Sequence, residues 1–493
     1  MTNPIKHAFV TRFTSPVVLA GLFLASAVLV LIVGPLFQKG SFIDAMLYKT
    51  VAFNYAIGEG SFWSMKYTNT SMTFFCEQPP FYIYALGNFY ALFGSHFLVD
   101  RVFTFLQLCV FIFFLYRICL KLFTPALPFF LLNLFLLLTI QAVSWSFSNQ
   151  VIETMVLMLL AVAIDLYLGF LTNKKFMYMV WFGIIVLALF LTKGFQSCFI
   201  VILPLSYAVF HLREEKVLWF AFFTSLFLLL IIVLLVFVYE PAKNWYACYY
   251  QARLVLTMNN VGATTDKHYQ ILIQLVMETI GVWLVFLSLS TYLLVKKNFS
   301  VKQGIVEPMK DRFSLALFLT FLAGSVPYTL SLVQRGFYLV PAYFCLVVFL
   351  CHAFRSHWLC FFEGMTLLSK QNWVKVLVPL IFMSSVVYSV LNINSYKREK
   401  ELAHDLELIT PLLKTGSILG ITPNVWNYFN LHSYMYMQKK ISLSADPKHE
   451  GFVVVYKNEV PTSERAVIRK IELPTLELDL YYRLVKNGPD TRR

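Results

Sequence analysis

Two carboxylates and three cations stand out in this chain because the residues around them are mostly apolar. Asp44 and Glu77 lie in the first long polar interval, which ends at Arg101, and Lys193 and Arg335 each lie between two apolar runs further on. A pair of carboxylates can supply a general base or hold a metal ion, and several cations can bind a phosphate that departs as a leaving group. These residue types indicate group transfer from a phosphate.

Lys193 has the strongest case among these residues. It lies between the apolar sequences IIVLALFLT and GFQSCFIVIL, and the second of these begins with the glycine of a turn. A charged side chain is costly to keep at a membrane boundary, and it marks function more often there than in a soluble protein. A lysine in this place requires an anion, either a carboxylate of the protein or a phosphate. In a membrane, that phosphate belongs to a lipid.

The composition places these charges in a membrane protein. Of the 493 residues, 59% are hydrophobic and 13% are charged, and the mean hydropathy is +0.68, whereas a soluble protein is about 25% charged. The apolar runs have the ~20 residues that a helix needs to cross hydrocarbon, and in lipid such runs must be helical. We expect an all-α polytopic membrane protein with about 11 transmembrane helices.

The sidedness of the loops depends on residues 81–94, an apolar run that is too short for a full span. If this run does not cross, the basic loop 296–312 stays inside, as the positive-inside rule requires; if it crosses, that loop is exported. We prefer the first arrangement, and the crossing itself stays open. The formal net charge of +14 then reflects cytoplasmic loops, and we expect no nucleic-acid partner. The expected spans are roughly residues 15–37, 101–120, 125–143, 149–171, 176–192, 195–211, 217–239, 271–295, 313–333, 336–354 and 373–391.

This arrangement divides the chain into a membrane module and a C-terminal domain. The expected parts are a transmembrane module at 1–391, with external loops at 38–100 and 240–270, and an extracytoplasmic C-terminal domain at 392–493. The last part is charged, with a helical-looking stretch at 395–414 and a strand-like run at 451–456, so we expect a small soluble α/β domain. Long domains cross a membrane largely regardless of their charge.

Each candidate residue also has a structural interpretation. Asp44 could be the N-cap of the helix that follows it, and Glu77 could be an ordinary loop charge. Arg101 could anchor a span at the membrane interface. Lys193 could simply neutralise Glu153, which the dipole of its own helix would favour at a helix N-terminus.

The sequence does not decide the roles of four further polar residues. Glu278, two turns into an apolar span, either belongs to a site or pairs with a cation of another span. Cys76 and Cys248 both fall in loops placed outside, so a disulfide between them is an option that sequence cannot establish. His268 could ligate a metal together with Glu77, although a lone histidine is usually not a ligand.

The order of the motifs resembles that of a known superfamily. The motifs are Asp44, Tyr48, Ala52 and Asn54; Gly58, Gly60, Phe62 and Trp63; Glu77 with Pro79 and Pro80; Arg101; Leu191 to Gly194; and Arg335, Tyr338 and Pro341. Together they resemble the GT-C superfamily of lipid-phosphate-sugar-dependent glycosyltransferases. The resemblance is strongest to the family-39 group, which includes protein O-mannosyltransferases and the aminoarabinose transferase that acts on lipid A. It covers residues 15 to about 345.

The resemblance implies a catalytic role for Asp44, near the donor phosphate and the acceptor hydroxyl, with inversion at the anomeric carbon. Glu77 would support Asp44 or bind an ion. The donor phosphate would be bound by Lys193, Arg101 and Arg335, and Tyr48 would shape the same site. The donor would be a polyprenyl-phosphate sugar and the acceptor a lipid, a glycan or a protein. We commit to no metal ligands, and a divalent cation as cofactor stays open.

Four departures from the group bear on the substrate. Ala45 replaces a glutamate that many members carry, and Leu47 replaces an arginine of the aminoarabinose transferase. Gln78 replaces a phosphate-facing lysine, and Phe195 replaces a proline. These changes weaken any assignment to aminoarabinose or lipid A and leave the general class in place.

The expected function is therefore a glycosyltransferase in the cell (inner) membrane, with its active site and C-terminal domain on the extracytoplasmic side. Two rivals remain. One is a transporter or flippase of a lipid-linked anionic substrate, although such sites usually lie near the bilayer midplane between broken helices. The other is a non-catalytic GT-C-like assembly subunit. The sugar, the acceptor and the oligomeric state do not follow from the sequence.

Overall fold

The computed structural model describes residues 15–255, 269–296, 310–330, 333–359, 362, 371–446, 451–456, 466–471 and 478–485. Within these ranges, nine helices are long and apolar enough to cross a membrane, or up to ten if a bent pair counts as one span. The chain is a multi-pass membrane protein. The spans and their helices are Pro16–Leu36 (α2, Pro16–Val28; η1, Leu29–Val33; α3, Gly34–Leu36), α6 (Phe97–Leu122), α9 (Glu153–Asn173), Phe176–Phe210, α12 (Glu215–Ile232) with η3 (Val233–Val238), α15 (Gln270–Lys296), α16 (Arg312–Ser325) with η7 (Val326–Leu330), η8 (Gly336–Leu339) with α17 (Val340–Ala353), and α19 (Asn372–Asn392).

Two of the expected spans, 176–192 and 195–211, lie in one apolar stretch that turns at Gly194, where φ is 66° and the Ser197 hydroxyl donates back to the carbonyl oxygen of Leu189 at 2.6 Å. Phe176–Phe210 is a continuous apolar stretch of 35 residues, made of α10 (Phe176–Lys193), the 3₁₀ segment η2 (Gly194–Val201) and α11 (Ile202–Phe210). The eight residues of η2 are an unusually long run of 3₁₀ helix, a feature that often marks a hinge or a strained segment.

A second difference concerns residues 141–149, because the sequence predicts a break between the spans 125–143 and 149–171. They form helix α8 (Gln141–Asn149), which follows α7 (Ala126–Leu138) at a bend of 80°. Three of its polar side chains bond within the helix: Ser144 donates to the carbonyl oxygen of Gln141 at 3.0 Å, and Ser148 and Asn149 donate to that of Trp145 at 3.0 and 2.8 Å. Because these three side chains are bonded within the helix, most of α8 can be buried despite its composition.

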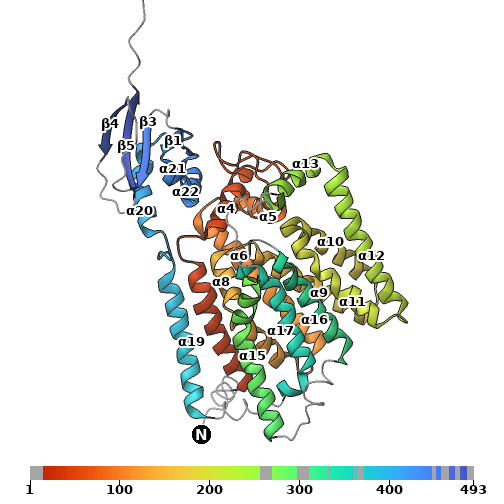
Figure 1. Ribbon diagram of the computed structural model, residues 1–493. Coiled ribbons are helices and arrows are strands. Elements are labelled where there is room, and N and C mark those ends of the chain that lie inside the picture. Colours follow the sequence, from red (N-terminus) through yellow and green to blue (C-terminus); the bar gives the residue numbers. More distant parts are fainter. Residues whose placement is uncertain are drawn as a thin grey trace, which may run out of the picture. The chain divides into compact units, whose positions relative to one another are not determined.

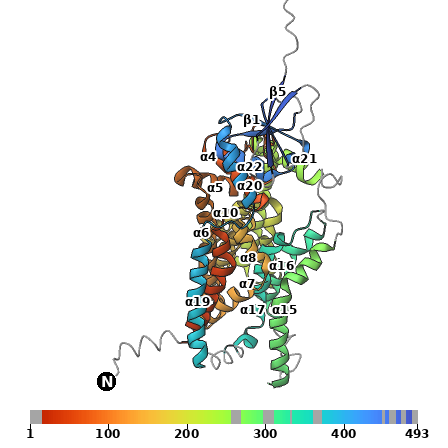
Figure 2. The same cartoon turned by 90° about the vertical axis from the view of Figure 1, so that its left-hand side faces the viewer.

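The membrane helices differ in how far they are buried. In α9 and α17, 78% and 83% of the most apolar stretch is buried, against 17% in α12 and in α19. Exposed apolar side chains on the latter two suit contact with lipid. The first and last of these helices, α2 and α19, lie side by side in both views (Figures 1 and 2), and Ser389 donates to the carbonyl oxygen of Leu29 at 3.1 Å.

Two compact units make up the chain. One contains most of the membrane helices, and the other combines residues 38–76 and 83–100 with the C-terminal part from Asn394 onward. In the second unit, α4 (Ile43–Ala56) and most of α5 (Pro80–Phe93) accompany α20 (Lys400–Ile409), η9 (Thr410–Leu412), α21 (Pro423–Trp426) and α22 (Phe429–Lys439). With 14 residues, α5 is shorter than any of the candidate spans.

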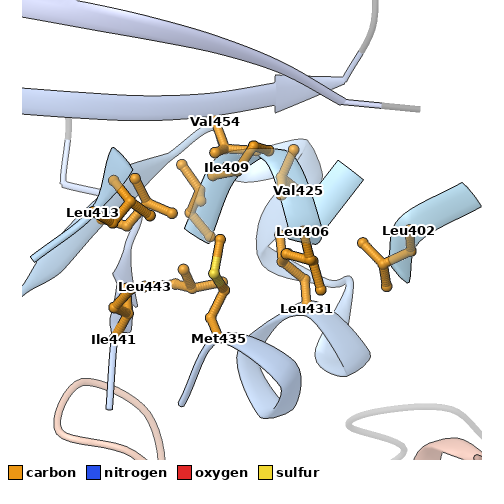
Figure 3. Close-up of a cluster of buried hydrophobic side chains, with 12 residues drawn as sticks. Leu402, Leu406, Ile409, Leu413, Val425, Leu431, Met435, Ile441, Leu443 and Val454 are labelled. Atoms are coloured by element: carbon orange, nitrogen blue, oxygen red, sulfur yellow. The ribbon is translucent and has the colours of Figure 1, made fainter. Parts of the chain in front are cut away.

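The C-terminal part is a small α/β fold, as the sequence predicted. Its five-stranded sheet has the order β2-β1-β3-β5-β4, with β1 parallel to β2 and β3, and β5 antiparallel to β3 and β4. The strands are β1 (Ile418–Ile421), β2 (Ser442–Ser444), β3 (Gly451–Tyr456), β4 (Ala466–Ile471) and β5 (Leu478–Val485). Side chains from α20, α22 and the sheet meet in one buried apolar cluster (Figure 3), which includes Leu406, Met435 and Val454.

The first polar loop is bonded directly to this α/β fold. The Tyr67 hydroxyl donates to the carbonyl oxygen of Phe429 at 3.0 Å and lies 2.9 Å from the Ser433 hydroxyl. The Thr70 hydroxyl donates to the carbonyl oxygen of Leu443 at 2.5 Å. The loop and the C-terminal residues therefore stabilise one another across about 360 residues of sequence.

Glu59 forms the charged centre of this contact. Its carboxylate accepts from Lys440 at 2.9 Å, from Lys66 at 3.3 Å and from the Tyr436 hydroxyl at 3.0 Å. The hydrogen bond from Lys440, followed by those from Tyr436 and Lys66, lowers the pKa of Glu59 from 4.5 to about 2. The ionised carboxylate therefore stabilises the folded unit at neutral pH.

We expect this contribution to fade in acid. Because the pKa of Glu59 is lower in the folded chain, its stabilisation is fully present above about pH 4.5 and is lost as the pH falls toward 2. Glu59→Gln should lower the apparent melting temperature of the purified chain at pH 7, and the gap to wild type should shrink as the pH falls through this window. A gap that stays constant down to pH 2.5 would contradict the assignment.

Candidate functional site

A buried ion pair joins the ends of two membrane helices. Glu153 is the first residue of α9 and Lys193 the last residue of α10, so each charge is favoured by the dipole of its own helix. Their side chains, 1% and 5% exposed, form a direct ion pair. Gly194 ends α10 with a φ of 66°, a conformation that favours glycine. The interpretation in which Lys193 neutralises Glu153 is confirmed as a contact.

Both partners of this pair have further features. The ammonium of Lys193 lies 4.4 Å from the centre of the Tyr338 ring, which brings the Arg335–Tyr338 motif beside the Leu-Thr-Lys-Gly turn. Within the described part of the chain, the second carboxylate oxygen of Glu153 is buried and has no hydrogen-bond partner. The site therefore holds an anion whose bonding is incomplete, next to a cation that an aromatic face also attracts.

Asp44 lies in the first turn of α4, where its charge also suits the helix dipole. The N-cap of α4 is Phe42, in extended conformation, so the interpretation of Asp44 as the N-cap is wrong. Asp44 is half-buried, whereas Tyr48 is buried. The two residues are four positions apart and share one face of the helix.

Next to them, α4 carries a buried ion pair that the sequence analysis missed. Lys49 pairs with Asp100, and both side chains are almost fully buried. Lys49 also donates to the Ser41 hydroxyl at 2.7 Å, just before the helix begins. This pair fixes the start of α4, and with it the position of Asp44. The available signal was a lysine inside an apolar helix and an aspartate at the start of a span.

The other predicted residues differ in exposure. Glu77 is half-buried just before Pro79 and Pro80. Arg101 is 4% exposed. Arg335 is exposed, and its side chain has no hydrogen bond or ion pair among the described residues. Asp44 and Tyr48 belong to the unit with the C-terminal part. The other predicted site residues belong to the membrane unit: Glu77, Arg101, Lys193 and Arg335.

The described residues give no metal cluster and two kinds of cysteine. Where the structure describes the chain, no group of three or more His, Cys, Asp or Glu side chains could hold a metal ion. His268, the suggested partner of Glu77, lies outside these ranges. Cys76 and Cys248 are disulfide-bonded, whereas Cys109, Cys119, Cys198, Cys345 and Cys351 are free.

A polar cavity of about 260 Å³ lies within the membrane unit, and the sequence analysis did not find it as a site. It is lined by Gln141, Ala142, Trp145, Gln274, Glu278, Gly336 and Phe337, from α8, α15 and η8. Glu278 accepts a hydrogen bond from the backbone of Ala142 at 2.8 Å, at the start of α8. The signal was polar residues at Gln141, Gln274 and Glu278 within otherwise apolar stretches.

The fold agrees with that of solved structures, although no protein-family model and no curated protein matches the sequence. The crystal structure of ArnT, an aminoarabinose transferase, from Cupriavidus metallidurans in the apo state matches 93% of this chain and 97% of its own, with 12% identity and a TM-score of 0.61. The chain has the GT-C fold. The same ArnT bound to undecaprenyl phosphate shows this GT-C fold as well, with a TM-score of 0.58 and 13% identity over 93% of this chain and 97% of ArnT.

The extent of these GT-C matches decides how much of the resemblance holds. They cover 93% of this chain, whereas the ordered motifs span residues 15 to about 345. The expected fold class is confirmed over this longer range.

Proposed function

We propose that this protein is a glycosyltransferase that moves a sugar from a polyprenyl phosphate to an acceptor at the outer face of the cytoplasmic membrane. The observation that carries the proposal is the GT-C fold over 93% of the chain, shared with ArnT in the apo state and bound to undecaprenyl phosphate. The motifs from Asp44 to Pro341 occur on this fold in the order that the family-39 group has. The acceptor is a lipid, a glycan or a protein.

Asp44 acts as the base in this proposal. Its carboxylate accepts the proton of the acceptor hydroxyl while the hydroxyl oxygen attacks the anomeric carbon. The bond between that carbon and the phosphate oxygen breaks, and the electron pair leaves with the polyprenyl phosphate. Attack from the face opposite the phosphate inverts the anomeric carbon. Glu77 supports Asp44, and Tyr48, one helical turn further along α4, shapes the site.

The cations act on the departing phosphate. The donor is a phosphodiester with one negative charge, and the leaving polyprenyl phosphate gains a second charge as the bond breaks. A cation therefore interacts more strongly with the transition state than with the donor, which is the condition for lowering the barrier. Arg335 is exposed and suits the first contact with the phosphate. Lys193 and Arg101 are buried and suit contact once the donor is seated.

Lys193 has two anions to choose between. Its present partner is Glu153, one oxygen of which has no hydrogen bond within the described residues. When a phosphate approaches, the ammonium can turn toward it on its flexible stem while the Tyr338 face still attracts it. We infer that Glu153 holds the Lys193 side chain in place until the donor arrives.

The cysteines support the proposed sidedness. Disulfides persist in oxidising surroundings outside the cytoplasm. Cys76 lies in the first expected external loop and Cys248 in the second, and both are disulfide-bonded. The free cysteines at positions 109, 119, 198, 345 and 351 all lie in the apolar helical segments.

A turnover assay tests the proposal. We expect the purified chain, supplied with polyprenyl-phosphate sugars and candidate acceptors, to release polyprenyl phosphate and to form a glycosylated product. Mass spectrometry of the lipid extract measures both. Movement of the lipid across liposomes without turnover would favour a transporter instead. Neither turnover nor movement with any donor would favour an assembly subunit.

A further inference from the structure

The cavity between α8, α15 and η8 has the size of a site for one small group. Its volume of about 260 Å³ is just below the ~300–1,000 Å³ of pockets that enclose drug-sized ligands. It lies where α7 and α8 bend by 80°. Trp145 of α8 and Phe337 of η8 stack with ring centres 5.2 Å apart, so the lining is partly aromatic.

Two acceptor oxygens converge on one side of this cavity. A Cβ atom added at Gly336 would lie 3.5 Å from the side-chain oxygen of Gln274 and 3.9 Å from Oε1 of Glu278. The Gln274 oxygen is buried, and it has no hydrogen-bond donor within the described residues. Because a buried acceptor without a donor is costly, a donor group from a ligand would stabilise this arrangement.

Helix capping explains only part of the cluster. Glu278 Oε2 accepts the backbone N–H of Ala142 and so caps the start of α8. That contact uses one oxygen and leaves Oε1 directed toward the space beside Gly336. It accounts neither for the unpaired Gln274 oxygen nor for the cavity. A small ring that carries hydroxyl or amino groups and has an apolar face would fill the cavity and would donate to both Glu278 Oε1 and the Gln274 oxygen.

We propose that this cavity binds one sugar ring, neutral or amino, of the donor or the acceptor in the transfer proposed above, on which this assignment rests. The hydroxyl or amino groups donate to Gln274 and Glu278, and the aromatic side chains cover the apolar face of the ring. The charge of Glu278 favours an amino sugar and repels a sugar acid. Arg335, exposed and next to Gly336 in the chain, suits a phosphate attached to the ring.

Binding to simple glycosides tests the chemistry without turnover. The probes are methyl glucoside, methyl glucosaminide and methyl glucuronide, added to the full chain in nanodiscs and measured by competition in saturation-transfer NMR. We expect the wild type to prefer the glucosaminide and the glucoside to the glucuronide. Glu278→Gln keeps an oxygen for the Ala142 N–H but removes the charge, so the preference for the glucosaminide over the glucuronide should fall about tenfold.

Two variants accompany this one. Gly336→Val fills the space beside Gln274 and should weaken the binding of all three glycosides. This variant leaves Glu278 intact, so it tests the site even if Glu278→Gln impairs folding. Glu215→Gln is the matched control, because Glu215 is exposed in the first turn of α12 and, among the described residues, its side chain accepts a hydrogen bond only from Trp219, at 3.1 Å. This control should leave the order of the three glycoside affinities unchanged.

A lipid arm separates the two sources of the ring. If the ring belongs to the donor, Glu278→Gln and Gly336→Val should weaken the binding of decaprenyl-phosphoglucose about tenfold. The binding of decaprenyl phosphate, which has no sugar, should stay unchanged. If it belongs to the acceptor, both lipids should bind as in wild type while the glycosides weaken. Glycoside binding that neither variant changes would overturn the assignment. A chain that transfers no sugar but binds glycosides through Glu278 would refute the proposed function and not this one.

Discussion

Asp44→Asn is expected to lower kcat for sugar transfer by about 10²–10⁴-fold, the usual contribution of a positioned general base. Asparagine has nearly the same shape and keeps an oxygen at this position, but it does not accept a proton from the acceptor hydroxyl. Helix α4 should persist because its N-cap is Phe42 and its start is held by the buried Lys49–Asp100 pair. Donor binding should therefore be retained. Single-turnover release of polyprenyl phosphate, with donor binding measured in parallel, checks both parts.

Asp446→Asn is the matched control for this variant, because Asp446 is exposed just beyond β2 in the same unit. It should turn over at the wild-type rate. Asp44→Glu adds a second comparison, since it keeps the base but moves it by one methylene, and we expect part of the activity to remain. Unchanged kcat in Asp44→Asn would remove the base assignment and shift attention to Glu77.

The elements predicted best from the sequence are those defined by local chemistry. The helix after Asp44, the β3 strand and the ends of α9 and α10 follow from short patterns, and α4, β3 and the Lys193 helix end are found where expected. The contact between Lys193 and Glu153 was also foreseeable, because a lysine between two apolar arms requires an anion. In each case a few neighbouring residues carry the information.

The features that were not predicted depend on contacts distant in sequence. Nothing near Tyr67 indicates that its hydroxyl would bond to Phe429, and nothing near Lys49 identifies Asp100 as its partner. Helix α8 was taken for a loop because hydropathy counts Ser144 and Asn149 as polar, although both are bonded to their own helix. Hydropathy measures the side chain alone, whereas burial depends on whether its polar atoms find partners.

The same limit applies to the cavity. The sequence shows Glu278 as a charge inside an apolar span. It does not decide whether Glu278 belongs to a site or pairs with a cation of another span. The structure shows one of its oxygens on the backbone of α8 and the other beside Gly336. A single polar residue in a span indicates that a partner exists, and only the packing of α8, α15 and η8 identifies it.

Breaking the Lys193–Glu153 pair is expected to have the second large effect. Lys193→Met keeps the volume and removes the charge, which leaves the carboxylate of Glu153 buried without its cation. Losing one partner of a buried pair typically costs about 3–5 kcal/mol. The apparent melting temperature of the purified chain should fall accordingly, and donor turnover should be lost.

The double variant Glu153→Gln with Lys193→Met separates folding from catalysis. It removes both charges, so most of the lost stability should return, because replacing a whole buried pair is often close to neutral. If Lys193 stabilises the departing phosphate, kcat should stay about 10²–10³-fold below wild type, the usual cost of losing one such group. If Lys193 only neutralises Glu153, stability and turnover should return together. The single variant Glu153→Gln completes the comparison. It removes the carboxylate that pairs with Lys193, so the Lys193 ammonium can bind a phosphate instead. If Lys193 contacts the donor phosphate, this variant should bind decaprenyl phosphate more tightly than wild type.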